Sequence, residues 1–332
     1  MRVLIIGGTR FLGRHIAELA LQRGHHLTLL HRGRSGPDLF PDAEHRIADR
    51  DDDLAVLATG EWDSVIDTSA YVPRQVRALA AALAGRVGQY QLISSISAYA
   101  RFDADGTDEN AALDVLPDPT VEAITGDTYG GLKALCEQAA VDAYGARCLI
   151  ARPGLIVGPF DPTGRFTWWP TRVARGGEVL APGDPSARVQ FIDARDCATW
   201  LLDQAQAQRY GRFNLTGPNS ALTMGELLNT AQHVLNPQAQ LTWVDEAFLL
   251  AQGVAPWSEM PVWLPQKSAA MHAMNIGRAI ATGLVCRPLA QTLADTAEWA
   301  RSVATPLPAG VGLSAEREAA LLHDWAAHPA RA

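Results

Sequence analysis

The chain starts with a short apolar run that ends in a glycine turn, and no other feature limits the possible folds as strongly. The residues from Val3 to Ile6 are all apolar, and three of the four are β-branched, as is typical of a strand buried on both faces of a parallel sheet. Gly7 and Gly8 end the run, and from Phe11 onward apolar side chains recur at helical spacing. In such a turn, backbone N–H groups and the positive end of the helix dipole face one point. The stretch therefore predicts an α/β fold with an anion site at its first turn.

The spacing of the turn favours the pyrophosphate of a dinucleotide as that anion. Gly7 and Gly13 occupy the first and last glycine positions of the dinucleotide fingerprint, and Arg10 stands where the middle glycine is usual. We expect the Arg10 guanidinium to lie beside a phosphate; the alternative is a turn that binds no ligand. The candidate nucleotide contacts of this turn are Gly7, Thr9, Arg10, Phe11, Leu12 and Gly13.

Strands and helices alternate after the first turn. Short apolar runs predict strands at 27–30, 46–48, 64–67, 89–94 and 147–151, and helical periodicity predicts helices at 75–83 and 129–144. Because parallel strands need helical crossovers, this order predicts a Rossmann-type doubly wound parallel sheet. Beyond Pro153 the pattern changes to segments rich in proline, glycine and tryptophan, which indicates a smaller, mixed C-terminal substrate domain.

The totals exclude several other classes of protein. The chain has 332 residues and a formal net charge of −8, which argues against nucleic acid or an anionic membrane as the main partner. The N-terminal apolar run is too short for a signal peptide, and no segment approaches the length of a membrane span, so we expect a cytoplasmic protein. The four cysteines and nine histidines show no metal-ligand spacing, and we expect no metal.

The end of the second predicted strand indicates which nucleotide binds. An acidic residue there would bond the ribose hydroxyl groups of NAD, whereas this chain has Arg32. Because a guanidinium can grip a 2′-phosphate, the residue favours NADP(H) as the cofactor; the alternative is a solvated basic loop. Asp49, after the third strand, is a candidate for bonding the adenine amino group. The adjacent Arg50 is a further candidate contact.

Candidate catalytic side chains follow the fifth strand and begin the next helix. Tyr129 and Lys133 are four residues apart, hence on one helix face, and an ammonium there favours the phenolate of a tyrosine whose ordinary pKa is about 10. Lys133 is also placed to bond the nicotinamide ribose. Ser95 is placed to bond a substrate carbonyl oxygen, although the serines of this loop have loop capping as an alternative role. The coincidence of these residues with the glycine turn makes the set specific.

In these stretches the chain resembles the extended short-chain dehydrogenase/reductase superfamily, often called the NAD-dependent epimerase/dehydratase family. The matching segments are 7–13, 67–71, 94–99, Tyr129 with Lys133, 152–159 and 190–196. The Gly-Gly-Thr-Arg turn and the segment 67–74 look like an atypical bacterial branch that is similar to chloroplast stem-loop RNA-binding proteins. The resemblance implies that Ser95 orients the carbonyl, that Tyr129 is the acid/base with Lys133 as its partner, and that the cofactor is flanked by Thr68, Ser69, Ala70 and Pro153.

The resemblance also implies the domain limits. The NADP-binding domain is expected at 1–155 plus about 189–212, and the substrate-binding domain at about 156–188 and 213–332. Members of the superfamily often form homodimers through the helices that flank the Tyr-Lys motif, so a homodimer is expected.

Two departures from the family pattern bear on the substrate. Ile96 and Ser97 stand where similar sugar-nucleotide dehydratases carry an Asp-Glu pair, so elimination chemistry lacks its acid and base. Val189 stands where nucleotide-sugar members tend to carry Arg, which puts a nucleotide-diphosphate grip in doubt. The candidate substrate contacts are Tyr71, Ser97, Phe166, Trp168, Trp169 and Trp257. The alternative for any single tryptophan is packing in the hydrophobic core or under a lid. Of the adjacent pair Trp168 and Trp169, we expect at least one to face solvent unless a ligand covers it.

Together these features predict an NADPH-dependent oxidoreductase that reduces a small, apolar or aromatic carbonyl compound, or oxidises the corresponding alcohol, through Ser95, Tyr129 and Lys133. One alternative is a nucleotide-sugar-type epimerase that retains its cofactor. The other is an RNA-binding or NADP-sensing protein on the same fold.

Overall fold

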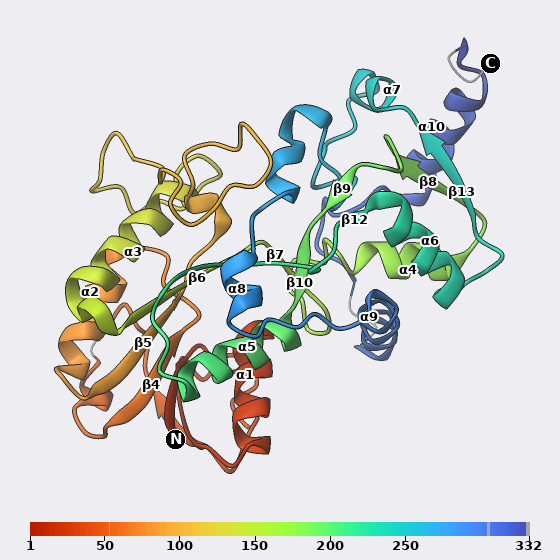
Figure 1. The fold of residues 1–332 in the computed structure, drawn as a ribbon. Coiled ribbons are helices and arrows are strands. Elements are labelled where there is room, and N and C mark those ends of the chain that lie inside the picture. The colour runs from red at the N-terminus through yellow and green to blue at the C-terminus, as the bar shows by residue number, and fades with distance from the viewer. Residues whose placement is uncertain (53, 304–305, 330–332) are drawn as a thin grey trace. The chain divides into compact units, whose positions relative to one another are not determined.

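The computed structural model describes residues 1–52, 54–303 and 306–329, and its chain divides into two compact units (Figure 1). Unit 1 comprises Met1–Ile156, Ala194–Gly217 and Met274–Val285; unit 2 comprises Val157–Asp193, Pro218–Ala273 and Cys286–Ala332. Unit 1 thus includes residues 213–217 and 274–285, which the sequence-based limits assigned to the substrate domain. The Asn214 side chain explains part of this difference, because it donates to the carbonyl oxygens of Thr107 at 3.0 Å and Asn275 at 2.9 Å.

Unit 1 is built on one seven-stranded parallel sheet with the strand order β11-β6-β5-β4-β1-β2-β3. Its strands are β1 (Arg2–Ile6), β2 (His26–His31), β3 (Glu44–Ile47), β4 (Trp62–Asp67), β5 (Val87–Ile93), β6 (Cys148–Pro153) and β11 (Gly211–Leu215). Val3 to Ile6 are buried in the middle of this sheet, as their apolar run predicts. The predicted Rossmann-type α/β fold is confirmed.

The longer helices of unit 1 pack in pairs against the sheet (Figure 1). They are α1 (Phe11–Gln22), α2 (Pro73–Leu83), α3 (Tyr129–Tyr144), α5 (Ala194–Gln206) and α8 (Gly277–Ala281), with 3-10 turns η1 (Ala55–Leu57), η2 (Ile96–Ala98) and η3 (Gly145–Arg147). Helix α1 packs on α5, and α2 packs on α3. The α2 helix starts two residues before the predicted position because Pro73 suits the first helical turn, where a missing N–H costs nothing.

Unit 2 combines helices with short strands. Its helices are α4 (Trp168–Arg175), α6 (Met224–Leu235), α7 (Glu246–Ala251), α9 (Leu289–Val303) and α10 (Ala315–Ala326), with the 3-10 turn η4 (Gln266–His272). Its strands are β8 (Glu178–Pro182), β9 (Arg188–Val189), β10 (Phe191–Asp193), β12 (Leu222–Thr223) and β13 (Gln240–Val244), and β7 (Leu155–Val157) lies where the chain passes from unit 1 into unit 2. Strand β13 pairs with β8 in parallel, and α4, α6 and α9 pack on one another. Among the described residues, no helix is both long and apolar enough to cross a bilayer.

Candidate active site

The glycine turn between β1 and α1 brings the backbone of Gly13 close to the backbone of Gly7. Gly7 has a φ of 91°, which favours glycine, and a Cβ atom on Gly13 would lie 2.2 Å from the carbonyl oxygen of Gly7. Phe11, the first helical residue, has a φ of 35°, an unusual value for a residue with a side chain. The turn therefore holds a strained backbone against the start of α1, as functional turns often do.

The start of α1 fits a bound phosphate. Arg10 is the N-cap residue in an extended conformation, and no side chain caps the helix, so the first turn offers its N–H groups to an incoming anion. The Arg10 side chain is exposed, whereas Thr9 and Leu12 are buried beneath the turn. Uncapped donors and a close glycine contact are the features that a dinucleotide pyrophosphate requires.

The ribose end of the predicted nucleotide site contains a loose ion pair. Arg32 follows β2, and its guanidinium lies 3.7 Å from the carboxylate of Asp49, which follows β3. About half of the Arg32 side chain is exposed, at 54%. A contact of this length on the surface contributes little to stability, so Arg32 remains available to a ligand.

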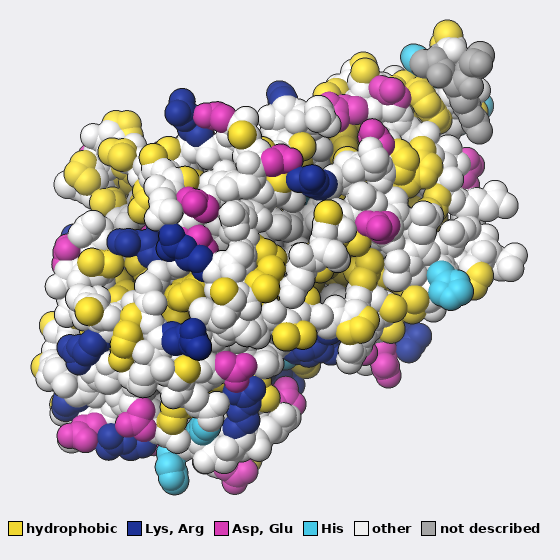
Figure 2. Space-filling view, in the orientation of Figure 1, with side chains coloured by type: hydrophobic (Ala, Val, Ile, Leu, Met, Phe, Trp, Pro, Cys, Tyr) yellow, Lys and Arg dark blue, Asp and Glu magenta, His cyan; other side chains and the backbone are white. Residues whose placement is uncertain are grey.

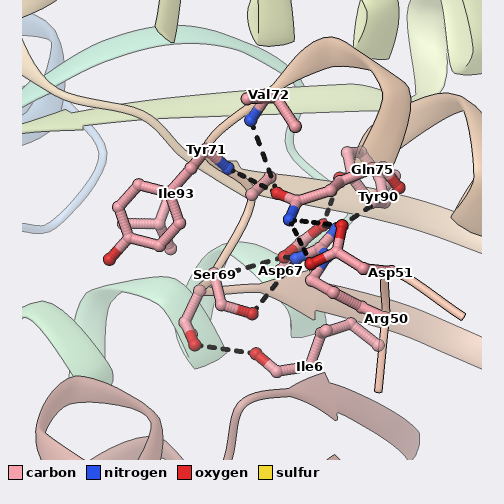
Figure 3. A network of polar contacts seen from close by, with 12 residues as sticks. Ile6, Arg50, Asp51, Asp67, Ser69, Tyr71, Val72, Gln75, Tyr90 and Ile93 are labelled. Carbon is pink, nitrogen blue, oxygen red and sulfur yellow. Dashed lines mark hydrogen bonds and ion pairs between the residues drawn. The ribbon is translucent and has the colours of Figure 1, made fainter. Parts of the chain in front are cut away.

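Arg50 faces a different partner. Its guanidinium donates to both carboxylate oxygens of Asp67, at 2.7 and 2.9 Å, and to the Ser69 hydroxyl at 3.1 Å (Figure 3). Tyr90 donates its hydroxyl to the same carboxylate at 2.8 Å, and the backbone N–H of Ser69 donates at 3.1 Å. Burial alone would raise the pKa of Asp67, but the charge and hydrogen bonds of Arg50 outweigh it and lower that pKa. Arg50 therefore acts as the buried counter-ion of the loop after β4.

The same network shapes the loop 67–72 (Figure 3), part of which was expected to flank the cofactor. Thr68 donates its hydroxyl to the carbonyl oxygen of Ile6 at 2.7 Å, which ties the loop to the strand before the glycine turn. The side-chain oxygen of Gln75 accepts from the backbone N–H of Tyr71 at 2.9 Å. The Tyr71 side chain itself is 43% exposed at this edge of the sheet.

Lys133 joins this loop to the neighbouring strand. Its ammonium donates to the carbonyl oxygens of Ala70 at 2.8 Å and Ile93 at 2.7 Å, and it lies 5.5 Å from the centre of the Tyr71 ring. The side chain is buried, and burial lowers the pKa of the Lys133 amine. Tyr129, one helical turn earlier, is half-buried at the first residue of α3.

Close packing brings the start of α3 against the serine loop. A Cβ atom on Gly130 would lie 2.2 Å from the carbonyl oxygen of Ser97, so only glycine allows this approach. The Ser95 hydroxyl oxygen accepts from the backbone N–H of Ser97 at 3.1 Å, which is the capping role considered for these serines. An accepting hydroxyl keeps its own proton to donate, so this role is compatible with a bond to a substrate oxygen. Pro153 is buried at the end of β6.

The sequence reasoning missed a second buried ion pair behind the serine loop. Arg152 donates to both carboxylate oxygens of Glu137, at 2.9 and 2.6 Å, and Ser94 donates to the same carboxylate at 2.6 Å. Arg152 also donates to the Tyr99 hydroxyl at 2.8 Å. A signal for this pair existed, because Glu137 lies four residues after Lys133 on the same inward face of the helix. An acidic residue on the buried face of a helix predicts a buried partner.

The expectation that Trp168 or Trp169 faces solvent is wrong. Trp168 is 3% exposed and Trp169 is fully buried, with its indole N–H donating to the carbonyl oxygen of Pro261 at 2.6 Å. Phe166 is also fully buried and packs on Phe191, with ring centres 4.9 Å apart. These rings are covered by unit 2 itself, so they form its core. Among the predicted substrate contacts in unit 2, only the half-buried Trp257 keeps an accessible surface.

Among the described residues, no group of three or more His, Cys, Asp or Glu side chains is arranged to hold a metal ion.

Comparison with protein families identifies the chain. The model of the family described as "NAD dependent epimerase/dehydratase family" matches residues 3–215, which include the glycine turn, the serine loop and the Tyr-Lys helix. The chain belongs to the NAD-dependent epimerase/dehydratase family. This family binds a nicotinamide dinucleotide, and the uncapped turn at the start of α1 fits one.

Individual relatives within the epimerase/dehydratase family are distant. The chloroplast stem-loop binding protein of 41 kDa b from Arabidopsis thaliana is 26% identical over 235 residues, which are 65% of this chain and 58% of that protein. The match thus spans less than two thirds of the relative.

Among solved structures, the UDP-glucuronic acid 4-epimerase of Bacillus cereus in complex with NAD has a TM-score of 0.66 at 13% identity, over 92% of this chain and 100% of that one. The UDP-glucose 4-epimerase of Thermotoga maritima has a TM-score of 0.66 at 16% identity, with the same coverage. At these identities the likeness shows the fold alone.

Proposed function

We propose that this chain is a nicotinamide-dinucleotide-dependent enzyme that works at a secondary alcohol carbon as an epimerase does. Such an enzyme oxidises the alcohol, keeps the carbonyl intermediate bound and reduces it again on the other face. The observation that carries the proposal is Tyr129 and Lys133 on a helix that packs on the serine loop at the carboxyl edge of the sheet. Membership of the epimerase/dehydratase family supports this reaction class.

Each catalytic residue has a distinct role in this proposal. Tyr129 takes the alcohol proton during oxidation and returns it during reduction, and Ser95 donates a hydrogen bond to the substrate oxygen. Lys133 favours the phenolate of Tyr129 by its charge and, through Ala70 and Ile93, holds the two chain segments on which the nicotinamide end would lie. The bound nicotinamide dinucleotide supplies the hydride chemistry.

A second candidate is a net carbonyl reductase or dehydrogenase with exchangeable NADP(H), acting on a small apolar or aromatic substrate. Two observations favour it: Val189 is buried where nucleotide-sugar members of the family tend to carry Arg, and Arg32 stands at the ribose end. The NADP-sensing or RNA-binding alternative rests on the stem-loop binding relative. A net charge of −8, and the mixture of acidic and basic side chains over the face drawn in Figure 2, speak against RNA. A homodimer and a cytoplasmic location remain predictions.

Nucleotide retention separates the two enzymatic candidates. If the chain is an epimerase, the purified protein is expected to hold about one nicotinamide dinucleotide per chain that survives extensive dialysis and is released only on denaturation, since the cofactor is regenerated in each cycle. Mass spectrometry of the released nucleotide and turnover on a panel of nucleotide sugars check this. A nucleotide that exchanges freely, together with net turnover of NADPH on a carbonyl panel, would instead favour the reductase. Salt-dependent RNA binding with no turnover on either panel would contradict both.

Arg32→Asp tests the choice of nucleotide. Because Arg32 is proposed to bond the 2′-phosphate, the variant is expected to weaken NADPH binding by about 10- to 100-fold, as loss of a charged hydrogen bond does. NADH binding should change little or improve. Arg301→Asp is the matched control, since it makes the same charge change at an exposed position of α9 in unit 2. Titration calorimetry with both nucleotides measures the effect, and equal losses for NADPH and NADH would remove the 2′-phosphate argument.

A further inference from the structure

Two histidines are hydrogen-bonded at the end of β2. His31 is the last residue of β2 and is 7% exposed, and His45 lies on the same face of the neighbouring strand β3. The His31 Nε2 and His45 Nδ1 atoms are 2.8 Å apart, and the rings meet edge to face with an interplanar angle of 87°. Each ring has one further partner, so both nitrogen atoms of each imidazole are hydrogen-bonded.

The partners decide which nitrogen carries each proton. The backbone N–H of Gly33 donates to His31 Nδ1 at 3.1 Å, so this nitrogen is unprotonated and His31 carries its proton on Nε2. That proton is donated to His45 Nδ1, which leaves His45 with its proton on Nε2. His45 then donates to the carbonyl oxygen of Phe40 at 3.1 Å. The chain of bonds is complete only when both imidazoles are neutral.

The two outer bonds hold the two ends of one loop. Residues 32–43 connect β2 to β3, and the loop 33–43 is the part of this connection after Arg32. Gly33 and Phe40 both have positive φ values, of 70° and 63°. A left-handed conformation is costly for a residue such as Phe40, so its carbonyl needs an external partner to keep its orientation. The His45 bond and a bond from the Ala43 N–H at 2.9 Å supply it. The loop also begins directly after Arg32, where a dinucleotide presents its adenosine ribose.

We propose that His31 and His45 are positioning residues that hold the loop 33–43 beside the nucleotide ribose and release it on protonation, which makes nucleotide binding pH-dependent. The inference rests on the proposed function insofar as it places the ribose at the end of β2. A proton on His31 Nδ1 removes the acceptor for Gly33. A proton on His45 Nδ1 sets two N–H groups against each other and breaks the bond between the rings.

The direction of the pH effect follows from burial. Burial and the neighbouring His45 lower the pKa of His31, so the closed loop favours the neutral ring. An open loop would restore the ordinary histidine pKa of about 6.5, and the closed state therefore loses favour as the pH falls below that value. The other ionisable residues on the surrounding elements are Arg14, His15 and Glu18 of α1, His26 of β2, Arg32 and Asp49 at the strand ends, Glu44 and Arg46 of β3, and Arg34, Asp38 and Asp42 of the loop. The Glu44 carboxylate accepts hydrogen bonds from the Thr28 hydroxyl and from the Arg46 guanidinium, so its charge already has partners on β2 and β3.

Binding of NAD⁺ and NADP⁺ at two pH values tests the inference. For the wild type, the Kd for NAD⁺ is expected to rise about tenfold between about pH 8 and about pH 5.5, since one competing proton weakens binding tenfold per pH unit below its pKa. NAD⁺ is the primary probe because the 2′-phosphate of NADP⁺ itself titrates near pH 6. Titration calorimetry measures both ligands, with circular dichroism at each pH to verify folding.

The hydrogen-bonded chain Gly33–His31–His45–Phe40 is called the relay below. Two variants separate the protonation of this relay from a general effect of acid on the protein. In the double variant His31→Asn/His45→Gln, the Asn oxygen can still accept from Gly33 and the Gln amide can still donate to Phe40, but neither side chain titrates. It is expected to bind NAD⁺ nearly as tightly as the wild type at pH 8 and to lose the pH dependence. His31→Leu removes the acceptor for Gly33 and is expected to bind weakly at both pH values. His233→Gln, at an exposed position of α6, is the control and should retain the wild-type profile.

The outcomes distinguish the relay from the proposed function. If no nicotinamide dinucleotide binds at pH 8, the proposed function fails. If the wild type binds tightly and equally at both pH values, or the double variant keeps the full pH dependence, the relay is wrong and the proposed function stands. If the double variant is too unstable to measure at pH 5.5, the NAD⁺ affinities of the wild type and His31→Leu are compared at pH 8. Equal affinities at that pH contradict the proposed role of His31.

Discussion

Replacing Tyr129 by Phe is expected to lower turnover by about 100- to 10,000-fold, the usual contribution of a general acid or base. The phenol is required only while a proton moves, and Phe keeps an aromatic ring at the first position of α3, the helix that packs on the serine loop. Nucleotide affinity should therefore stay within a few-fold of the wild type, so the loss falls on kcat. Steady-state kinetics on the substrate identified by the panels, with calorimetric nucleotide binding, measure both quantities.

A matched tyrosine makes this result specific. Tyr210→Phe removes the same hydroxyl from a side chain that is 41% exposed and far along the chain from the Tyr-Lys helix, and it should leave turnover unchanged. If Tyr129→Phe retains most of its activity while the nucleotide is still bound, another group moves the proton. The proposed roles of Ser95 and Lys133 would then need to be reassigned.

Arg50→Met is expected to destabilise the protein by about 3–5 kcal/mol, as removal of one partner of a buried ion pair typically does. The Asp67 carboxylate would lose two short hydrogen bonds and remain fully buried beside Tyr90. The loop 67–72 would lose its anchor at the same time, so nucleotide affinity should fall as well. Urea unfolding monitored by circular dichroism measures the stability.

Asp67 also determines how this effect depends on pH. Its pKa in the folded protein lies below the ordinary value, so the ion pair stabilises the wild type above about pH 4 and this contribution is lost as the pH falls through the folded pKa. In Arg50→Met, burial without the cation raises the Asp67 pKa instead, so the variant gains relative stability on acidification. The difference in unfolding free energy between the wild type and Arg50→Met should thus become smaller as the pH falls toward 4.

Two further variants test whether the loss of stability comes from the buried ion pair. Arg74→Met removes an exposed arginine that pairs with Glu122 and Asp51, and it should change the unfolding midpoint very little. The double variant Arg50→Met/Asp67→Asn removes both charges and should recover part of the lost stability, because no bare carboxylate stays buried. A single variant as stable as the wild type would show that the pair does not anchor the loop.

The order and type of the elements in the first part of unit 1, from β1 to β6, were predictable because they depend on local patterns. Apolar runs separated by helical repeats specify a parallel sheet, and Gly7 and Gly13 specify a turn that leaves N–H groups exposed. The i, i+4 spacing likewise put Tyr129 and Lys133 on one helix face. Local periodicity carries this information, so strands β1 to β6, the glycine turn and the Tyr-Lys helix could be predicted from the sequence alone, whereas the edge strand β11 was not predicted.

Which polar or aromatic side chain meets which partner was decided only by the tertiary structure. Arg50 is predicted to contact the nucleotide, and only the sheet shows that its guanidinium also pairs with Asp67, 17 residues away. At least one of Trp168 and Trp169 was expected to face solvent, yet both are buried, and Trp169 donates to the carbonyl oxygen of Pro261, far along the chain. His31 and His45 meet only because β3 pairs beside β2. Such contacts join residues whose separation in the chain follows no repeat, so only the packed fold determines them.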